Sequence, residues 1–297
     1  MTKIQPTVKQ DETQPQALAA TQDVRSLSVK ETPAYLAEYR DDASTDLLKA
    51  YITPPRLKTV QPTSRAPFNE KFAVGDLVIL PLMQVLASYD KNKPDTAAFT
   101  LTPVMFYPEW VCWNPLDTKG ALPGIRDKSF DSRSPIAIKA KNAALRNSEL
   151  CPEIPEKDGK KQYLKYLEHL NYLFIIHGNE EFRDMAVAMT FASGEHRAGT
   201  SFNALITQRR APLWACNFQA VIRRRTNEKG WWMGVDFENP SAETGVAGWV
   251  DAELAPRYKA LHEQCKQQYE DRLIVMDYDD EALEGGSNAP PRDATDM

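Results

Sequence analysis

The stretch FQAVIRRRTNEKGWWMGVDFENP, residues 218–240, predicts the most sharply defined element of the fold. Two runs rich in aromatic and β-branched residues flank TNEKG at 226–230, in which asparagine and glycine tolerate the positive φ of tight turns. The pattern therefore predicts a β-hairpin whose first strand ends in three arginines and whose second strand begins with two tryptophans.

Positive charge is concentrated at the tip of this predicted hairpin. Side chains alternate between the two faces of a strand, which assigns one face to Phe218, Ala220, Ile222 and Arg224 and the other to Gln219, Val221, Arg223 and Arg225. Both faces are therefore basic at the tip, and the sequence shows no obvious local acid partner for the arginines. Alternation lets only one of the two tryptophans face a groove with ease, so we expect Trp231 to be exposed and Trp232 to lie in the core.

The segments that precede the hairpin predict a β-rich core. Residues 76–80 read as a buried strand that Pro81 ends, and residues 171–178 and 182–193 read as further strands. The segment 97–115 is dense in aromatic residues, valine and threonine, and its three prolines predict short or edge strands.

Four segments predict helices. Two of them, residues 134–148 and 158–170, lie between the predicted strands, the second with Tyr163, Leu167 and Leu170 on one face. A third is expected to begin at Thr200 or Ser201 as its N-cap and to end before Pro212. The fourth covers residues 251–273 and presents one apolar face, made of Leu254, Tyr258, Leu261, Cys265 and Tyr269.

Composition divides the chain into three parts. Residues 1–50 are polar and predict a flexible arm, residues 51–272 predict the folded core, and residues 273–297 predict a disordered acidic tail. Residues 271–297 hold eight acids and two bases, a charge of -6, so the rest of the chain has a net charge of about +1 although the whole carries -5. The chain shows no apolar run typical of a signal peptide or membrane span and no clustered cysteines, which favours a cytoplasmic protein with reduced thiols.

The basic hairpin indicates a surface for single-stranded nucleic acid. Cations that contact phosphates, beside aromatic rings on which bases stack, hold a single strand without reading its sequence. The predicted nucleic-acid-binding residues are Arg197, Arg209, Arg210, Trp214, Phe218, Arg223, Arg224, Arg225, Lys229, Trp231 and Trp232. The alternative is that the aromatic residues belong to the core and that the arginines pair with distant acids or form a solvated face.

Other functions have weaker support in the sequence, and no cofactor is expected. A metal-dependent nuclease would need acids such as Asp76, Glu109, Asp117, Asp127 and Asp131, yet their spacing matches no recognisable site. Whether Cys112, Cys151 and His169, or His262 and Cys265, bind a metal stays open. A virion structural or assembly protein is the main alternative, since a β-rich body with flexible ends also suits contacts between subunits, and a homo-oligomer stays open.

Several segments together resemble a family of phage-encoded single-stranded-DNA-binding proteins. They are GDLVILP, FYPEWVCWNPLD, IRDKSFD, the Gly-Thr-Ser-Phe helix, and RRAPLWACNFQAVIRRRTNEKGWWMGVDFENP followed by GWVDAEL. The resemblance covers residues 51–269 and implies a role in phage DNA replication or recombination in the host cytoplasm. It also implies an oligonucleotide-binding (OB) barrel, so the predicted class is α+β, β-dominated, with an OB-like core and helical insertions. The acidic charge of the tail predicts that it docks a partner such as a phage polymerase, helicase or recombinase, or that it competes for the basic groove; the alternative is a solubilising terminus.

Overall fold

The computed structural model describes residues 54–64, 68–94, 98–115, 124–177, 181–182, 184–228, 230–240 and 247–271. The chain divides into two units, Met1–Ala43 and Ser44–Met297, and every described residue belongs to the second. The predicted arm at 1–50 and the predicted tail at 273–297 lie outside the described residues.

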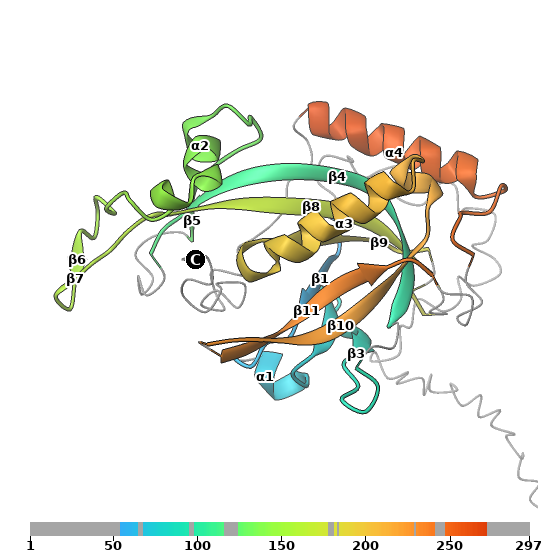
Figure 1. The fold of residues 1–297 in the computed structure, drawn as a ribbon, viewed down its shortest axis with the longest axis horizontal. Coiled ribbons are helices and arrows are strands. Elements are labelled where there is room, and N and C mark those ends of the chain that lie inside the picture. The colour runs from blue at the N-terminus through green and yellow to red at the C-terminus, as the bar shows by residue number, and fades with distance from the viewer. Residues whose placement is uncertain are drawn as a thin grey trace, which may run out of the picture. The chain divides into compact units, whose positions relative to one another are not determined.

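One curled sheet forms the body of the second unit, so the predicted β-dominated α+β class is confirmed (Figure 1). Among the described residues it contains nine strands in the order β11-β10-β4-β8-β9-β1-β2-β3, with β5 also beside β4. All pairs are antiparallel except β1 with β9. The strands are β1 Arg56–Thr59, β2 Asp76–Leu80, β3 Gln84–Ser88, β4 Phe99–Trp113, β5 Ile125–Ser129, β8 Lys165–His177, β9 Ala186–Phe191, β10 Phe218–Asn227 and β11 Gly230–Glu238. A separate small hairpin joins β6 Glu156–Lys157 to β7 Lys160–Lys161.

The curl brings the two ends of the sheet together. The side chain of Gln61, just after β1, donates from Nε2 to the Met233 carbonyl at 2.8 Å and accepts from the Met233 N–H at 2.9 Å. The Gln61 side-chain amide thus makes the two hydrogen bonds that a neighbouring strand would make with Met233 of β11. Leu86 of β3 and Ile222 of β10 consequently share one core, although five strands lie between β3 and β10 in the sheet.

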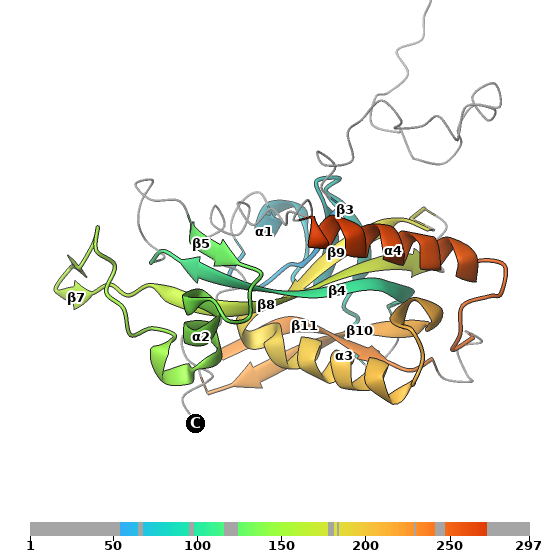
Figure 2. The ribbon, with the colours of Figure 1, turned by 90° about the horizontal axis from the view of Figure 1, so that it is seen from above.

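Helices cover both faces of the sheet (Figure 2). Helix α3, His196–Gln208, packs on the concave face, where its Phe202 contacts the rings of Tyr172, Phe218 and Phe237. Helix α4, Ala255–Glu270, lies on the convex face, and its Tyr258 and Cys265 are buried while Leu261 and Tyr269 are partly buried. The predicted apolar face of this last helix is therefore confirmed. The remaining helices are α1 Phe68–Lys71 and α2 Pro135–Lys141, with the 3-10 turns η4 Ala143–Leu145, η5 Ser193–Glu195 and η6 Leu213–Ala215.

The longest strand corrects one expectation about proline. Pro103 and Pro108 both lie inside β4, a central strand of 15 residues, rather than in short or edge strands. Strand β8 pairs with β4 on one edge throughout, but on its other edge β10 reaches only Leu101 and β5 begins only at Trp110 among the described strands. Residues 102–109 of β4 therefore have no described partner strand on that edge. A proline nitrogen that faces this unpaired edge costs the sheet no hydrogen bond.

The helix predicted at 158–170 is wrong. This segment holds β7 and the start of β8, which pairs with β4 on one edge and with β9 on the other. The spacing of its apolar residues fits a helix, but a strand that is buried on both faces can have the same composition. The segment forms a strand because a central strand gains hydrogen bonds to its neighbours in the sheet.

Two other predicted helices are present, but they begin or end at other residues than predicted. The helix predicted at 134–148 is present as α2, capped by the Ser134 hydroxyl, and then as η4. Helix α3 begins at His196 and not at Thr200 or Ser201. The Thr200 hydroxyl donates to the Arg197 carbonyl inside the helix, so it does not act as an N-cap. The strand at 76–80 and the strands within 171–178 and 182–193 are confirmed.

Candidate nucleic-acid interface

The hairpin is present as predicted. Strands β10 and β11 pair from Gln219↔Glu238 to Asn227↔Gly230, so the turn is only two residues long. Gly230 has φ 147°, a conformation that side chains with a Cβ rarely adopt, which explains the glycine at this position.

Two of the three hairpin arginines have acid partners, contrary to the expectation from the sequence. Arg223 lies 3.5 Å from Asp236 and 2.6 Å from Glu238, and Arg225 lies 2.5 Å from Asp236. These acids stand on the returning strand, where antiparallel pairing brings them to the same face as Arg223 and Arg225. Asp236 and Glu238 lie 11 to 15 positions after the arginines with which they pair. They are therefore close in the hairpin but not local in the sequence.

The third arginine and the two tryptophans separate onto opposite faces. The Arg224 guanidinium stacks over the Trp231 ring, 4.3 Å from its centroid, and Trp231 is 38 % exposed, as expected. Trp232 is half-buried on the other face, and its Nε1 donates to Glu195 at 2.7 Å. Trp232 is therefore not a core residue, and it is this ring that borders the cleft described next.

The other predicted contacts are scattered. Phe218 is fully buried in the main core, so the prediction that its ring stacks with a base is wrong. Trp214 is partly buried against the cluster of Tyr258, Arg209 packs on the Phe218 ring, and Arg210 is exposed beyond α3. Lys229 lies outside the described residues.

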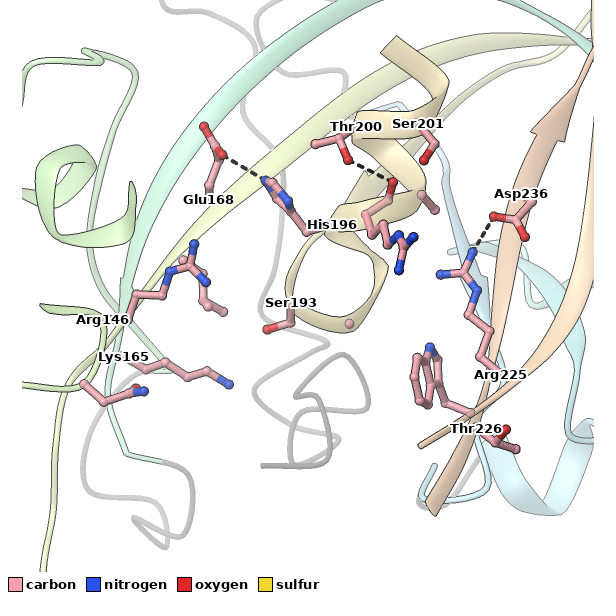
Figure 3. A pocket seen from close by; sticks show the side chains of 16 residues that line it. Arg146, Lys165, Glu168, Ser193, His196, Thr200, Ser201, Arg225, Thr226 and Asp236 are labelled. Carbon is pink, nitrogen blue, oxygen red and sulfur yellow. Dashed lines mark hydrogen bonds and ion pairs between the residues drawn. The ribbon is translucent and has the colours of Figure 1, made fainter. Parts of the chain in front are cut away.

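A cleft of about 770 Å³ opens on the concave face between α3, the start of β8 and the hairpin (Figure 3). Its basic side chains come from segments far apart in the sequence: Arg146 follows η4, Lys165 begins β8, Arg197 lies in the first turn of α3 and Arg225 lies on β10. Trp232 and the hydroxyl side chains of Ser193, Thr200, Ser201 and Thr226 complete much of the lining. In Figure 3, Arg146 and Lys165 lie on the side of the cleft opposite Arg225.

Sequence reasoning found part of this cleft and missed the rest. Arg197, Arg225 and Trp232 belong to the predicted set, whereas Arg146 and Lys165 do not. Lys165 was placed on a helix that does not exist, and no local signal in the sequence brings Arg146 to α3. Neither Arg146 nor Arg197 forms an ion pair with a residue that the structure describes.

The acids of the cleft are already engaged. Glu168 accepts a hydrogen bond from His196 Nε2 at 2.8 Å and another from Trp110 Nε1 at 3.1 Å, and the bond from His196 is the main cause that lowers the pKa of Glu168. Asp236 is paired with Arg223 and Arg225. Both carboxylates are thus compensated by neighbours in the fold. Arg146, Lys165 and Arg197 add three further positive charges to the lining.

The lowered pKa of Glu168 predicts a pH-dependent contribution to stability. The folded state binds a proton to Glu168 less readily than the unfolded state, whose value is 4.5, so the contribution is complete above pH 4.5 and is lost as the pH falls below it. Glu168→Gln is expected to lower the unfolding free energy at neutral pH by about 1 kcal/mol. Urea unfolding should show this difference shrinking in acid, while Glu263→Gln on exposed α4 shows none; a difference independent of pH would contradict the assignment.

The family of the chain follows from comparison with known proteins. A sequence model of the family described as Pam3 phage gp34-like protein matches residues 28–271. The chain belongs to the Pam3 phage gp34-like family. No curated protein and no solved structure matches the chain.

In this Pam3 phage gp34-like protein, a largely buried glutamate, whose side chain is 15 % exposed, links the hairpin to α3. Glu195 precedes α3 and lies 3.4 Å from Arg225, and burial raises its pKa although Arg225 acts in the opposite direction. Gly234 of β11 makes room for it, because a Cβ there would come within 2.7 Å of both carboxylate oxygens. The contact fixes the hairpin against the start of α3, so the two walls of the cleft are held together.

The metal candidates of this family member do not converge. Cys112 packs with Cys151 in a buried cluster, but His169 stacks on Trp113, and strand alternation places Trp113 on the face of β4 opposite to Cys112. His262 hydrogen-bonds through Nδ1 to the Val104 carbonyl at 2.7 Å. Within the described part of the chain, no group of three or more His, Cys, Asp or Glu residues is arranged to hold a metal ion, and Asp117 lies outside that part.

The helices of the described ranges were compared with what a membrane span requires. None of the helices in the described ranges combines the length and apolar character that crossing a bilayer requires. The prediction of a cytoplasmic location stays a prediction.

Proposed function

We propose that this protein binds single-stranded DNA in phage DNA replication or recombination, and that the cleft between α3, β8 and the hairpin receives the strand. The observation that carries the proposal is the convergence of Arg146, Lys165 and Arg197 on one cleft that Trp232 also lines. Cations that track the phosphates beside a ring that stacks on a base are the two components of sequence-tolerant binding to single strands. The curled sheet also supports the OB-like part of the proposal, with the helices as additions to that core.

The structure changes which residues we assign to the phosphates. Arg223 and Arg225 are held by acids, so in the proposal they shape the hairpin wall, while Arg146 and Arg197 contact phosphates directly. The exposed pair of Arg224 and Trp231 lies at the tip of the hairpin and supplies a further ring beside a cation.

A titration tests the proposal. Addition of a single-stranded oligonucleotide at low salt is expected to quench the tryptophan fluorescence and to produce a mobility shift. The logarithm of the affinity is expected to fall linearly with the logarithm of the salt concentration. Duplex DNA and RNA of the same length serve as competitors. Unchanged fluorescence together with no mobility shift would overturn the proposal, and cleavage of the oligonucleotide with Mg²⁺ would replace it by a nuclease.

The acidic tail predicts a separate effect. Residues 273–297 carry seven acids and one base, and an acidic segment of the same chain can compete with DNA for a basic cleft. Deletion of 273–297 is expected to tighten binding to single-stranded DNA severalfold at low salt and to weaken association with a phage polymerase, helicase or recombinase. Fluorescence titration of the full and shortened chains measures the first effect, and equal affinities would show that the tail is passive toward DNA.

A further inference from the structure

Trp249 presents a half-exposed ring at the C-terminal end of α3, away from the cleft lining. Its exposed fraction is 50 %. The Arg209 guanidinium lies 5.0 Å from the Trp249 ring centroid and 5.7 Å from that of Phe218, so a buried aromatic residue and an arginine together support the exposed ring. A guanidinium against one part of the ring leaves the remaining aromatic surface open to a flat ligand.

The segment that carries Trp249 is held in place by several contacts. Asn217 Nδ2 donates to the carbonyls of Ala247 and Trp249, both at 3.0 Å, and Arg209 donates to the Gly248 carbonyl at 2.9 Å. A Cβ at position 248 would come within 2.8 Å of the Arg209 guanidinium, so a larger residue there would displace this side chain. Trp249 is therefore preorganised, which reduces the conformational entropy that a ligand must immobilise.

The exposed face of α3 connects the cleft to Trp249. Residues 196–210 contain three arginines and no acid. The side chains that α3 exposes begin with Arg197 at the cleft and continue as Thr200, Ser201, Ala204, Thr207 and Gln208. With 13 residues, the helix spans about 20 Å, and exposed Arg210 follows its end. A polyanion that leaves the cleft along this face meets small or neutral side chains and then a second basic and aromatic surface.

We infer that Trp249 is a second base-stacking site, and that the single strand bound in the cleft continues along α3 to reach it. The inference rests on the proposed function and extends it, because it assigns a path and a minimum length to the ligand. Arg209 acts as a positioning residue that supports the ring, and Arg210 offers its charge to a phosphate next to the stacked base. Asp251 and Glu253, the acids that follow Trp249, are exposed. We therefore place the phosphate on the Arg210 side of the ring.

Substitution of Trp249 combined with a change in ligand length tests the inference. For a thymidine oligonucleotide of about 16 nucleotides, Trp249→Ala is expected to lower the affinity by roughly 5- to 100-fold, whereas for one of about 4 nucleotides it leaves the affinity unchanged. Trp249→Phe should recover most of the loss. The matched control is Tyr163→Ala, which removes another exposed aromatic side chain, 39 % exposed, from the segment before β8.

The possible results separate the inference from the function it extends. Equal affinity of Trp249→Ala and the unmodified protein for the long oligonucleotide, while Arg146→Ala with Arg197→Ala weakens it, would overturn the inference alone. No binding of any oligonucleotide would overturn both. If Trp249→Ala does not fold, photocrosslinking of the unmodified protein to a bromodeoxyuridine oligonucleotide decides, because a crosslinked peptide containing Trp249 supports the inference and crosslinks confined to the cleft contradict it.

Discussion

Replacing Phe202 by alanine is expected to lower the free energy of unfolding by about 3 to 5 kcal/mol, the usual cost of deleting a buried phenyl ring. The side chain is 1 % exposed and its ring centroid lies 4.0 Å from that of Phe237 and 5.0 Å from that of Phe218. A cavity at this place removes contacts that α3 makes with the hairpin and with the centre of the sheet. Urea or thermal unfolding followed by circular dichroism measures the effect.

The control for this prediction is Ile138→Ala on α2. Ile138 is 54 % exposed, so its truncation is expected to change the unfolding free energy by less than about 0.5 kcal/mol. If Phe202→Ala were as mild as Ile138→Ala, the packing of α3 on the concave face would be wrong. Because α3 carries both Arg197 and the surface that leads to Trp249, the proposed DNA path depends on this packing.

Removing two cleft cations is expected to weaken binding to single-stranded DNA by roughly 30-fold at low salt, from about 1 kcal/mol for each lost phosphate contact. The double variant is Arg146→Ala with Arg197→Ala, whose side chains line the cleft and form no ion pair with a described residue. Each phosphate contact releases counterions, so the slope of log affinity against log salt concentration should become shallower by about 1.4. Fluorescence titration over a series of salt concentrations measures both quantities.

A second double variant provides the matched control. Arg257→Ala with Lys259→Ala also removes two positive charges, but from α4 on the convex face, where these side chains are 62 % and 58 % exposed. Their ion pairs with Asp184 and Glu263 are solvent-exposed and therefore weak. This variant should keep the salt slope of the unmodified protein. If both double variants reduced the affinity equally, net charge and not the cleft would govern binding, and the proposed site would be withdrawn.

Local sequence pattern is sufficient to predict the main features of the hairpin. Its two strands and the exposure of Trp231 follow from alternation and turn chemistry, which act between residues close in sequence. The apolar face of α4 follows in the same way from helical spacing. Local pattern fails where tertiary pairing opposes it. Leu167 and Leu170 fit a helix, but Leu167 pairs with β4, and Leu170 pairs with both β4 and β9, so their segment is a strand.

The candidate cleft shows the same division. The sequence by itself determined the hairpin, the apolar faces and the concentration of positive charge from Arg197 onward, because these depend on neighbours along the chain. Only the tertiary structure decided that Arg223 and Arg225 face acids, that Phe218 is buried, and that Arg146 and Lys165 meet Arg197 at one cleft. The physical reason is that an electrostatic environment depends on distance in space, and the curl of the sheet brings together side chains that are far apart in sequence.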